Sequence, residues 1–332
     1  MRVALLSFAF RPSLGGIERV SEILEQGLSK AGHEVRVATM STGPAEPGVL
    51  RQPSALELMS LLRWSDVVLE SNVSIRLSWP CILGLARRPR LTVLHTPIGV
   101  HGGNRQKWLD RAKMRLLPRR STYTVADWLG AELPFRTEFM PNPFDPSEYL
   151  DSGDERRSGV LFVGRLTRAK GLDVLIEALS TIDGPPQLTV VGDGPDYQEV
   201  HADARSRGLD VHFVGALPPA EVAKQMKKAA VLCIPSISEP PEVFPLVALE
   251  GLAAGCRIVA SDCGGLPEAV SGHGLVVPER SPSRLALALS EALSAGPIAP
   301  DERIARRGYL QRFRSDEVIS TYARVIEELV QR

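Results

Sequence analysis

Two stretches in the second half of the chain combine charged side chains with turn residues, a pattern suited to an anionic, hydroxyl-rich ligand. The first runs from Gly164 to Gly171 and carries Arg165 and Lys170 between an apolar run and an amphipathic one. Arginine offers paired N–H donors to phosphate oxygens, lysine offers a compact positive charge, and a helix start adds a favourable dipole. The stretch predicts a phosphate site, and a solvated basic turn is the alternative on composition alone.

The second stretch holds two carboxylates, Glu242 and Glu250, which bracket seven residues. Pro245 lacks an N–H and suits the first turn of a helix, so Glu242 would lie in the preceding loop and Glu250 just over one turn into the helix. Carboxylates at two depths can accept hydrogen bonds from the neighbouring hydroxyls of a sugar or a ribose. The alternative is a charge that complements the helix dipole together with an exposed helical glutamate.

The elements that position these residues follow from the alternation of short apolar runs with helical patterns, which is typical of strands and helices around a parallel sheet. We expect strands at 3–8, 34–38, 66–70, 91–95, 159–163, 187–191, 211–214, 231–234 and 257–260. We expect helices at 17–31, 172–179, 220–229 and 247–254, and a helical tail after 301. A connection rich in proline and charge, 141–158, separates the two series.

The pattern predicts an α/β protein with two doubly wound, Rossmann-like units. The first covers 1–145 and the second 158–300, and the C-terminal helices, 301–332, would pack back toward the first unit. Ligands of such sheets bind beyond the carboxyl ends of the strands, so a crevice between the two units is the expected site.

Length and composition fit this organisation. The chain has 332 residues, enough for two domains, and ordinary globular proportions of 44% hydrophobic and 23% charged residues. Basic and acidic side chains number 39 each, so no net positive field favours nucleic acid. Neither a signal peptide nor an apolar run long enough to span a membrane is evident. The four cysteines show no paired metal-binding spacing, and a reducing cytoplasm fits best: Cys81, Cys233, Cys256 and Cys263.

The order of the motifs resembles the retaining nucleotide-sugar glycosyltransferases of family 4, which have the two-domain GT-B fold. The resemblance covers almost the whole chain. It is carried by Gly15-Gly16 with Ile17-Glu18-Arg19-Val20, Val163-Gly164-Arg165-Leu166 to Lys170-Gly171, Val191-Gly192-Asp193-Gly194-Pro195, Glu242 to Glu250, and Asp262-Cys263-Gly264-Gly265-Leu266-Pro267-Glu268. Any one glycine-rich piece is weak, but the series in this order is specific.

The resemblance implies roles for individual residues. Arg165 and Lys170 would bind the donor diphosphate and stabilise it as leaving group, Glu242 would contact the transferred sugar, and Glu250 would bind the ribose. His95 matches the family's active-site histidine, although a lone histidine at a strand end is more often structural. The other donor-binding positions are the backbone-exposing pair Gly15 and Gly16, where no Cβ blocks a ligand, and Phe244, Pro245 and Leu246.

The implied reaction moves a glycosyl group from a nucleoside diphosphate sugar, UDP- or GDP-linked, to an acceptor hydroxyl with retention at the anomeric carbon. No Asp-x-Asp triplet occurs in the chain, and the cationic pair could supply the charge of a divalent metal. We therefore expect neither a metal nor another cofactor. Two positions depart from the family pattern: Pro245 stands where glycine is common, and Asn142-Pro143 stands where Asn-Gly is common.

A basic segment from 105 to 120 bears on the acceptor. It interleaves cations with apolar side chains, a composition that suits a helix on an anionic membrane surface, and a soluble basic face is the equal alternative. Membrane contact would favour a lipid-linked glycan acceptor, as in surface polysaccharide assembly, at the inner face of the membrane. The candidate contact residues are Arg105, Lys107, Trp108, Arg111, Lys113 and Arg115.

Three other functions compete with a transferase. A dehydrogenase is disfavoured because no Gly-x-Gly-x-x-Gly follows the first strand and Gly192-Asp193-Gly194 lacks the third glycine. A nucleotide-sugar isomerase or epimerase of the same fold is closer. A non-catalytic sugar-nucleotide-binding partner protein also keeps the fold.

Overall fold

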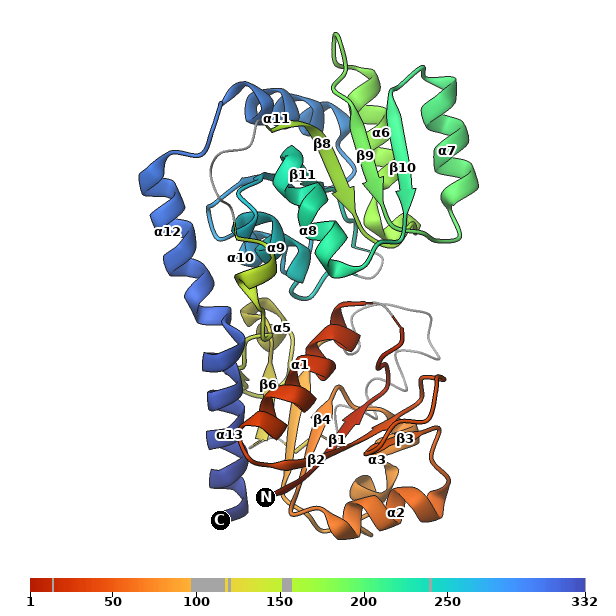
Figure 1. Ribbon diagram of the computed structural model, residues 1–332, viewed down its shortest axis with the longest axis vertical. Helices are drawn as coiled ribbons and strands as arrows, with labels where there is room; N and C mark the ends of the chain where they lie inside the picture. Colours follow the sequence, from red (N-terminus) through yellow and green to blue (C-terminus); the bar gives the residue numbers. More distant parts are fainter. Residues whose placement is uncertain (14, 97–116, 119–120, 151–156, 239–240, 332) are drawn as a thin grey trace. The chain divides into compact units, whose positions relative to one another are not determined.

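The computed structural model describes residues 1–13, 15–96, 117–118, 121–150, 157–238 and 241–331. Its contacts divide the chain into two compact units. The N-terminal unit comprises Met1–Phe144 together with Arg312–Arg332, and the C-terminal unit comprises Asp145–Gln311. Each unit is built on one parallel sheet (Figure 1).

The sheet of the N-terminal unit has the order β3-β2-β1-β4-β5-β6-β7 in the described part of the chain, with every neighbouring pair parallel. The central strands are buried along almost their whole length because both faces of the sheet are covered. The strands are β1 (Arg2–Ser7), β2 (Glu34–Thr39), β3 (Val49–Arg51), β4 (Val67–Ser71), β5 (Arg90–Leu94), β6 (Thr122–Thr124) and β7 (Glu138–Phe139).

Helices cover both faces of this sheet. On one face, α2 (Ala55–Trp64) and α3 (Ile75–Ile82) pack Leu58, Leu61 and Leu77 against alternate side chains of β1 and β4. Two further helices pack against the sheet. α1 (Gly16–Lys30) contacts β2, and α13 (Ser315–Gln331) contacts β4 and β5. The short helix α5 (Asp127–Ala131) lies beside β6 and β7.

The C-terminal unit repeats the design with the strand order β10-β9-β8-β11-β12-β13, all parallel. Its strands are β8 (Ser158–Val163), β9 (Leu188–Val191), β10 (Val211–Gly215), β11 (Ala229–Ile234), β12 (Arg257–Asp262) and β13 (Leu275–Pro278).

Its helices also lie on two faces. α6 (Leu172–Ser180), α7 (Tyr197–Ser206) and α11 (Pro282–Ser294) share one core with Val231 and Cys233 of β11. On the other face Gly251 of α9 (Leu246–Ala253) packs against Leu232, which alternates with those two residues. α8 (Pro219–Lys228) and α10 (Leu266–Val270) contact α9.

The helical tail is shared between the two units. α12 (Pro300–Leu310) packs on α9 in the C-terminal unit, and α13 packs on α1 in the N-terminal unit (Figure 1). Gly27 of α1 allows the close approach of α13, because a Cβ there would lie 2.5 Å from the side chain of Ile319. Two backbone bonds tie the end of the first segment to the start of α13: Phe144 N donates to Phe313 O (2.7 Å) and Ser315 N donates to Phe144 O (2.9 Å).

The predicted α/β class with two parallel, doubly wound sheets is confirmed. The expected strands and helices all form, with ends shifted by only one to a few residues. Four strands were not predicted, namely β3, β6, β7 and β13. They are only two to four residues long, so even β13, which is apolar, is too short to predict a strand from the sequence.

Candidate active site

The loop that follows β8 carries both predicted phosphate-binding cations. It runs from Gly164 to Gly171 and ends in a single 3-10 turn, Arg168–Lys170, before α6 begins. Gly171 has φ 66°, in the left-handed region, and a Cβ there would collide with the carbonyl oxygen of Pro235 just beyond β11. Glycine is therefore required both for the turn and for the close approach of the two loops.

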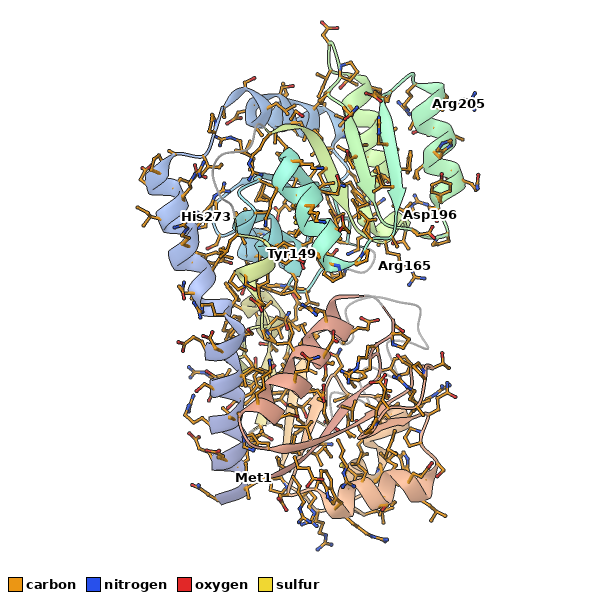
Figure 2. All side chains as sticks on the ribbon, viewed as in Figure 1. Met1, Tyr149, Arg165, Asp196, Arg205 and His273 are labelled. Carbon is orange, nitrogen blue, oxygen red and sulfur yellow. The ribbon has the colours of Figure 1, made fainter. Side chains whose placement is uncertain are left out.

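Arg165 is the exposed member of the cationic pair. Its side chain projects outward from the C-terminal unit (Figure 2), and it makes no hydrogen bond or ion pair with the described residues. The backbone on either side is fixed, since Gly164 N donates to Val191 O (3.0 Å) and Leu166 N donates to Asp193 O (2.9 Å). A guanidinium on a fixed loop is available for an anion at little cost in backbone ordering.

The glycine-rich turn after β9 explains how that loop is held. Gly192 has φ 138°, and a Cβ there would collide with the carbonyl oxygen of Gly164. A Cβ on Gly194 would likewise collide with the carbonyl oxygen of Leu166. The motif Gly192-Asp193-Gly194 thus acts here as packing for the Arg165 loop, which is a structural reason for its two glycines.

Lys170 and Glu242 form an ion pair through Nζ and Oε1. The lysine side chain is 32% exposed and the glutamate side chain 19%, so the contact is reachable from solvent. The two residues come from loops that follow different strands, β8 and β11. The structure therefore brings together the residue predicted to bind diphosphate and the residue predicted to contact sugar.

Glu242 is positioned by its neighbours. The buried hydroxyl of Ser236 donates to its Oε1 (3.1 Å), and the amide of Gly265 donates to its carbonyl oxygen (2.8 Å). Gly264, with φ 53°, leaves room for that carbonyl, which a Cβ would strike. The Gly264-Gly265 pair that follows β12 is consequently a support for Glu242.

Sequence reasoning missed a second carboxylate at this edge of the sheet. Glu279, just after β13, accepts hydrogen bonds from the amide of Ser238 (2.7 Å) and from its hydroxyl (2.9 Å). It therefore ties down the loop that carries Glu242. The available signals were two serines, Ser236 and Ser238, just after an apolar strand, and a glutamate directly after the apolar run Leu275–Pro278.

The predicted helix after this loop begins at Leu246, with Pro245 as its N-terminal cap residue. Glu242 lies in the loop before it, and Glu250 lies in its second turn and is half-buried. The ring of Phe244 is 6% exposed and packs in the interior, while Leu246 is half-buried. The roles assigned to Phe244, Pro245, Leu246 and Glu250 toward a donor stay predictions.

His95 lies in the N-terminal unit, directly after β5, and is 7% exposed. Its Nδ1 is 2.9 Å from Oδ1 of Asn142, a buried amide. Its backbone amide donates to Oδ1 of Asn72 (2.6 Å), which follows β4 and also accepts from the amide of Thr96 (3.1 Å). Within the described residues, the buried Nε2 has no hydrogen-bond partner.

Burial lowers the pKa of His95 to about 4, and the hydrogen bond to Asn142 offsets this only in part. The imidazole is therefore neutral at physiological pH. A neutral ring offers one N–H donor and one acceptor nitrogen, so it can bind a hydroxyl without adding charge.

The glycine pair of the N-terminal unit precedes α1. Gly15 caps the helix in an extended conformation that any residue can adopt, and a Cβ there would meet only the flexible side chain of Glu18. No described atom lies within 4 Å of a Cβ on Gly16. The packing of the described residues does not require glycine at 16, which leaves room for the predicted approach of a ligand.

The predicted membrane contacts lie outside the described residues: Arg105, Lys107, Trp108, Arg111, Lys113 and Arg115. In the part of the chain that is described, no helix has the length and apolar character needed to cross a membrane.

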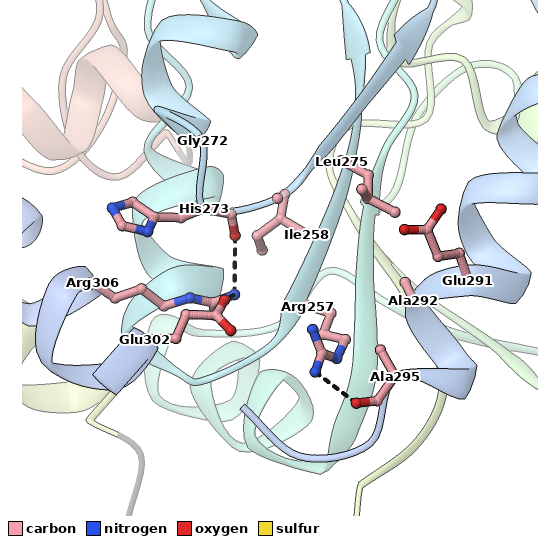
Figure 3. Close-up of a pocket in the computed structure, with 11 residues that line it drawn as sticks. Arg257, Ile258, Gly272, His273, Leu275, Glu291, Ala292, Ala295, Glu302 and Arg306 are labelled. Atoms are coloured by element: carbon pink, nitrogen blue, oxygen red, sulfur yellow. Dashed lines mark hydrogen bonds and ion pairs between the residues drawn. The ribbon is translucent and has the colours of Figure 1, made fainter. Parts of the chain in front are cut away.

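One pocket of about 200 Å³ lies away from these residues, near the opposite ends of β12 and β13 (Figure 3). Its two arginines are already used. Arg257 donates to Ala295 O (2.9 Å), and Arg306 donates to His273 O (3.0 Å) and to Glu302 (2.7 Å). These guanidinium groups hold neighbouring backbone segments and an acidic partner, so we assign the pocket no ligand.

The described residues contain no group of three or more His, Cys, Asp or Glu side chains that could hold a metal ion. The C-terminal unit gathers Arg165, Lys170 and Glu242 on loops at the carboxyl edge of its sheet, where α/β folds bind ligands. Such a set can bind an anion next to a hydroxyl group. His95, Gly15 and Gly16 lie at the corresponding edge of the other sheet.

Residues 152–311 match the family model for the glycosyl transferases group 1. This range falls entirely within the C-terminal unit and includes the four charged residues assigned to the donor. The matched region is just under half of the chain, and it contains the whole loop cluster around Lys170 and Glu242.

Among individual proteins, the D-inositol 3-phosphate glycosyltransferase of Jonesia denitrificans is 34% identical over 184 residues. These are 51% of this chain and 42% of the relative, so the chain spans less than half the length of that relative.

Solved structures match over the whole chain. Anabaena Alr3699/HepE in complex with UDP has a TM-score of 0.80 at 20% identity, covering 99% of this chain and all of that one. WaaG, a glycosyltransferase involved in lipopolysaccharide biosynthesis, has a TM-score of 0.73 at 20% identity, covering 98% and 99%. At these identities the likeness shows the fold, and the expected GT-B fold is confirmed.

Proposed function

We propose that this chain is a retaining glycosyltransferase of family 4 that moves a sugar from a nucleoside diphosphate sugar, UDP- or GDP-linked, to an acceptor hydroxyl. The observation that carries the proposal is the loop cluster of the C-terminal unit, in which Lys170 pairs with Glu242 and Arg165 stands exposed on a fixed backbone. Diphosphate and sugar are neighbours in the donor, as are these side chains in the fold. The UDP complex of Alr3699/HepE and the group 1 family match support the same substrate class.

In this proposal Arg165 and Lys170 stabilise the charge that develops on the departing diphosphate. The bond from the anomeric carbon to the phosphate oxygen breaks, the acceptor oxygen bonds to that carbon from the same face, and the diphosphate takes the acceptor proton. Preorganised cations at a developing charge are a large catalytic contribution. Glu242 leaves its ion pair with Lys170 and accepts hydrogen bonds from sugar hydroxyls when the donor binds. Glu250 binds the ribose, and neutral His95 positions the sugar and the acceptor.

We also propose that the reaction needs no metal ion or other cofactor. Two cations supply the charge that a divalent metal supplies in other transferases. Activity in excess chelator tests this directly, because a metal-dependent enzyme would lose turnover and regain it on adding Mg²⁺ or Mn²⁺.

For the acceptor we propose a lipid-linked glycan, with the protein in the cytoplasm against the inner face of the membrane. The support is the basic segment in the sequence and the likeness to WaaG, which is involved in lipopolysaccharide biosynthesis. Replacing Arg111, Lys113 and Arg115 by Glu should abolish co-sedimentation with anionic vesicles. The matched reversal of Lys224, Lys227 and Lys228 on α8 should not.

The isomerase and binding-partner alternatives are not favoured, because the relative and the structures named above are glycosyltransferases or nucleotide complexes. The experiment that tests the proposal is calorimetric binding of UDP, GDP, ADP and NAD. One nucleoside diphosphate should bind, and Glu250→Ala should weaken it by about 1.5–3 kcal/mol, as expected for a lost charge-assisted hydrogen bond.

The matched control is Glu177→Ala, which removes an exposed glutamate from α6 in the same unit and should leave binding unchanged. Binding of NAD alone would point to a dehydrogenase. An equal loss in both variants would show that Glu250 acts only through net charge.

A further inference from the structure

Asn142 is the only described residue with a hydrogen bond to the imidazole ring of His95. An amide oxygen only accepts, so the 2.9 Å contact between Asn142 Oδ1 and His95 Nδ1 requires that Nδ1 carry the proton. In a neutral imidazole the other nitrogen is then an unprotonated acceptor. The contact therefore selects a tautomer as well as a ring orientation.

No other described side chain determines which nitrogen of the His95 ring carries the proton. His95 and Asn142 are 7% and 5% exposed, so water does not compete freely at the contact. In the described residues no charged side chain perturbs His95, and burial and the Asn142 bond are the influences on its pKa. Asn72 holds the backbone of His95 and Thr96 but does not bond the ring. One asparagine thus fixes the main chain and the other fixes the imidazole.

Asn142 is itself held in place from outside this contact. Two residues further on, Phe144 exchanges backbone hydrogen bonds with Phe313 and Ser315 at the start of α13. The segment that carries Asn142 is therefore anchored to the C-terminal helix of its own unit. A flipped Asn142 amide would instead donate to an unprotonated Nδ1, so the placement of Oδ1 toward the ring is what selects the Nδ1–H form.

We propose that Asn142 is a positioning residue that holds His95 in the Nδ1–H tautomer and aims its Nε2 as a hydrogen-bond acceptor for a substrate hydroxyl. The proposal rests on the proposed function, since it requires His95 to face a sugar or an acceptor. It assigns a role to the asparagine of Asn142-Pro143, for which the sequence alone predicts no contact with His95. Buried Nε2, without a described partner, is the atom that the substrate hydroxyl would satisfy.

The first experiment measures the tautomer directly by long-range ¹H–¹⁵N correlation of the histidine rings, with His95 assigned by its loss in His95→Ala. The wild type should show the Nδ1–H form, and Asn142→Ala should show a mixture of both tautomers. Asn142→Asp keeps the shape but adds a negative charge, so it should raise the pKa of His95 by about 1–3. An Nε2–H form in the wild type, or an unmoved midpoint in Asn142→Asp, would overturn the proposal.

The second experiment is a double-mutant cycle on turnover of the nucleoside diphosphate sugar. Asn142→Ala should lower kcat about 10–100-fold, by analogy with the loss of a residue that orients a metal-bound histidine, with the donor KM little changed. The cost should largely vanish in the His95→Ala background. An equal cost in both backgrounds would show a structural role, and Ser147→Ala, an exposed neighbour, should retain full turnover.

The two arms separate this proposal from the function it rests on. If no nucleoside diphosphate sugar is turned over, the proposed function fails and the spectroscopic arm still decides whether Asn142 sets the tautomer. If turnover is found but the tautomer is insensitive to Asn142, only the positioning role is lost.

Discussion

The two candidate sites differ in charge and in exposure to solvent. In the C-terminal unit the important side chains are charged and partly exposed: Arg165 is free among the described residues and Lys170 is 32% exposed. In the N-terminal unit His95 is 7% exposed, its pKa is lowered to about 4, and its partners are neutral amides. The contrast suggests that one unit is built to meet an anion and the other to meet uncharged hydroxyls.

The units also hold their functional residues by different means. Glycines without a Cβ let the loops of the C-terminal unit interlock, so that Gly171, Gly192, Gly194 and Gly264 each accommodate a neighbouring carbonyl oxygen. In the N-terminal unit side-chain amides from two separate segments hold His95. Backbone packing thus positions the charged groups, and side-chain hydrogen bonds position the neutral one.

The largest expected effect comes from removing the free cation. Arg165→Ala should lower kcat/KM for the proposed transfer by about 10²–10³, because a preorganised donor to developing charge is lost. Arg168→Ala is the matched control, since it removes an exposed arginine from the same loop and should change turnover little. Turnover of Arg165→Ala within about twofold of the wild type would remove the charge argument for this unit.

A smaller effect, on stability, should follow from adding a Cβ at Gly171, where the loop after β8 lies against the loop after β11. Gly171→Ala and Gly184→Ala place a Cβ at nearly equal φ, 66° and 63°, but only the first strikes a carbonyl oxygen, that of Pro235. Gly184→Ala should cost about 1–2 kcal/mol from the left-handed backbone alone. Gly171→Ala should cost a further 1–3 kcal/mol, roughly, from overpacking.

Chemical unfolding followed by a probe in the C-terminal unit would measure the difference between these two variants. Equal losses would mean that the loops are not held by this contact. A larger loss in Gly171→Ala, with weaker nucleotide binding, would tie the packing of the loop to its function.

The smallest effect concerns a buried ionisable carboxyl group in the N-terminal unit, that of Glu70. Glu70, at the end of β4, is fully buried, accepts a hydrogen bond from Thr92 (2.7 Å) and lies 3.7 Å from the Arg90 guanidinium. Burial raises the pKa of its carboxyl, and Arg90 and Thr92 oppose this only in part. The folded state therefore holds a proton that the unfolded state releases at lower pH.

Stability of the wild type should accordingly fall as pH rises from the ordinary glutamate pKa of about 4.3 to the raised one. Glu70→Gln should remove this fall, so that its melting temperature exceeds that of the wild type more at high pH than at low pH. Glu57→Gln is a control of opposite sign, because hydrogen bonds from Ser54 lower the pKa of Glu57. Parallel pH profiles for wild type and Glu70→Gln would contradict the expected protonation.

The sequence predicted those parts of the molecule in which local chemistry and fold agree. The apolar runs at β1 and β8 predict the first strand of each sheet. The glycines and cations from Gly164 to Gly171 predict the cationic loop. The sequence could not predict the roles of Asn142, Ser236 or Glu279, because these roles depend on side-chain contacts that form only in the folded chain. Glu279 follows β13, which at four residues is too short for the sequence to predict as a strand.

The division of the helical tail between the two units affects the order in which these units can fold during synthesis. The C-terminal unit, Asp145–Gln311, is one continuous segment, whereas the N-terminal unit takes α13 from the last residues of the chain. On the ribosome the unit that is synthesised first must therefore wait, with the faces of α1, β4 and β5 that meet α13 uncovered, until Ser315–Gln331 has emerged. The unit that is synthesised second can complete its fold first.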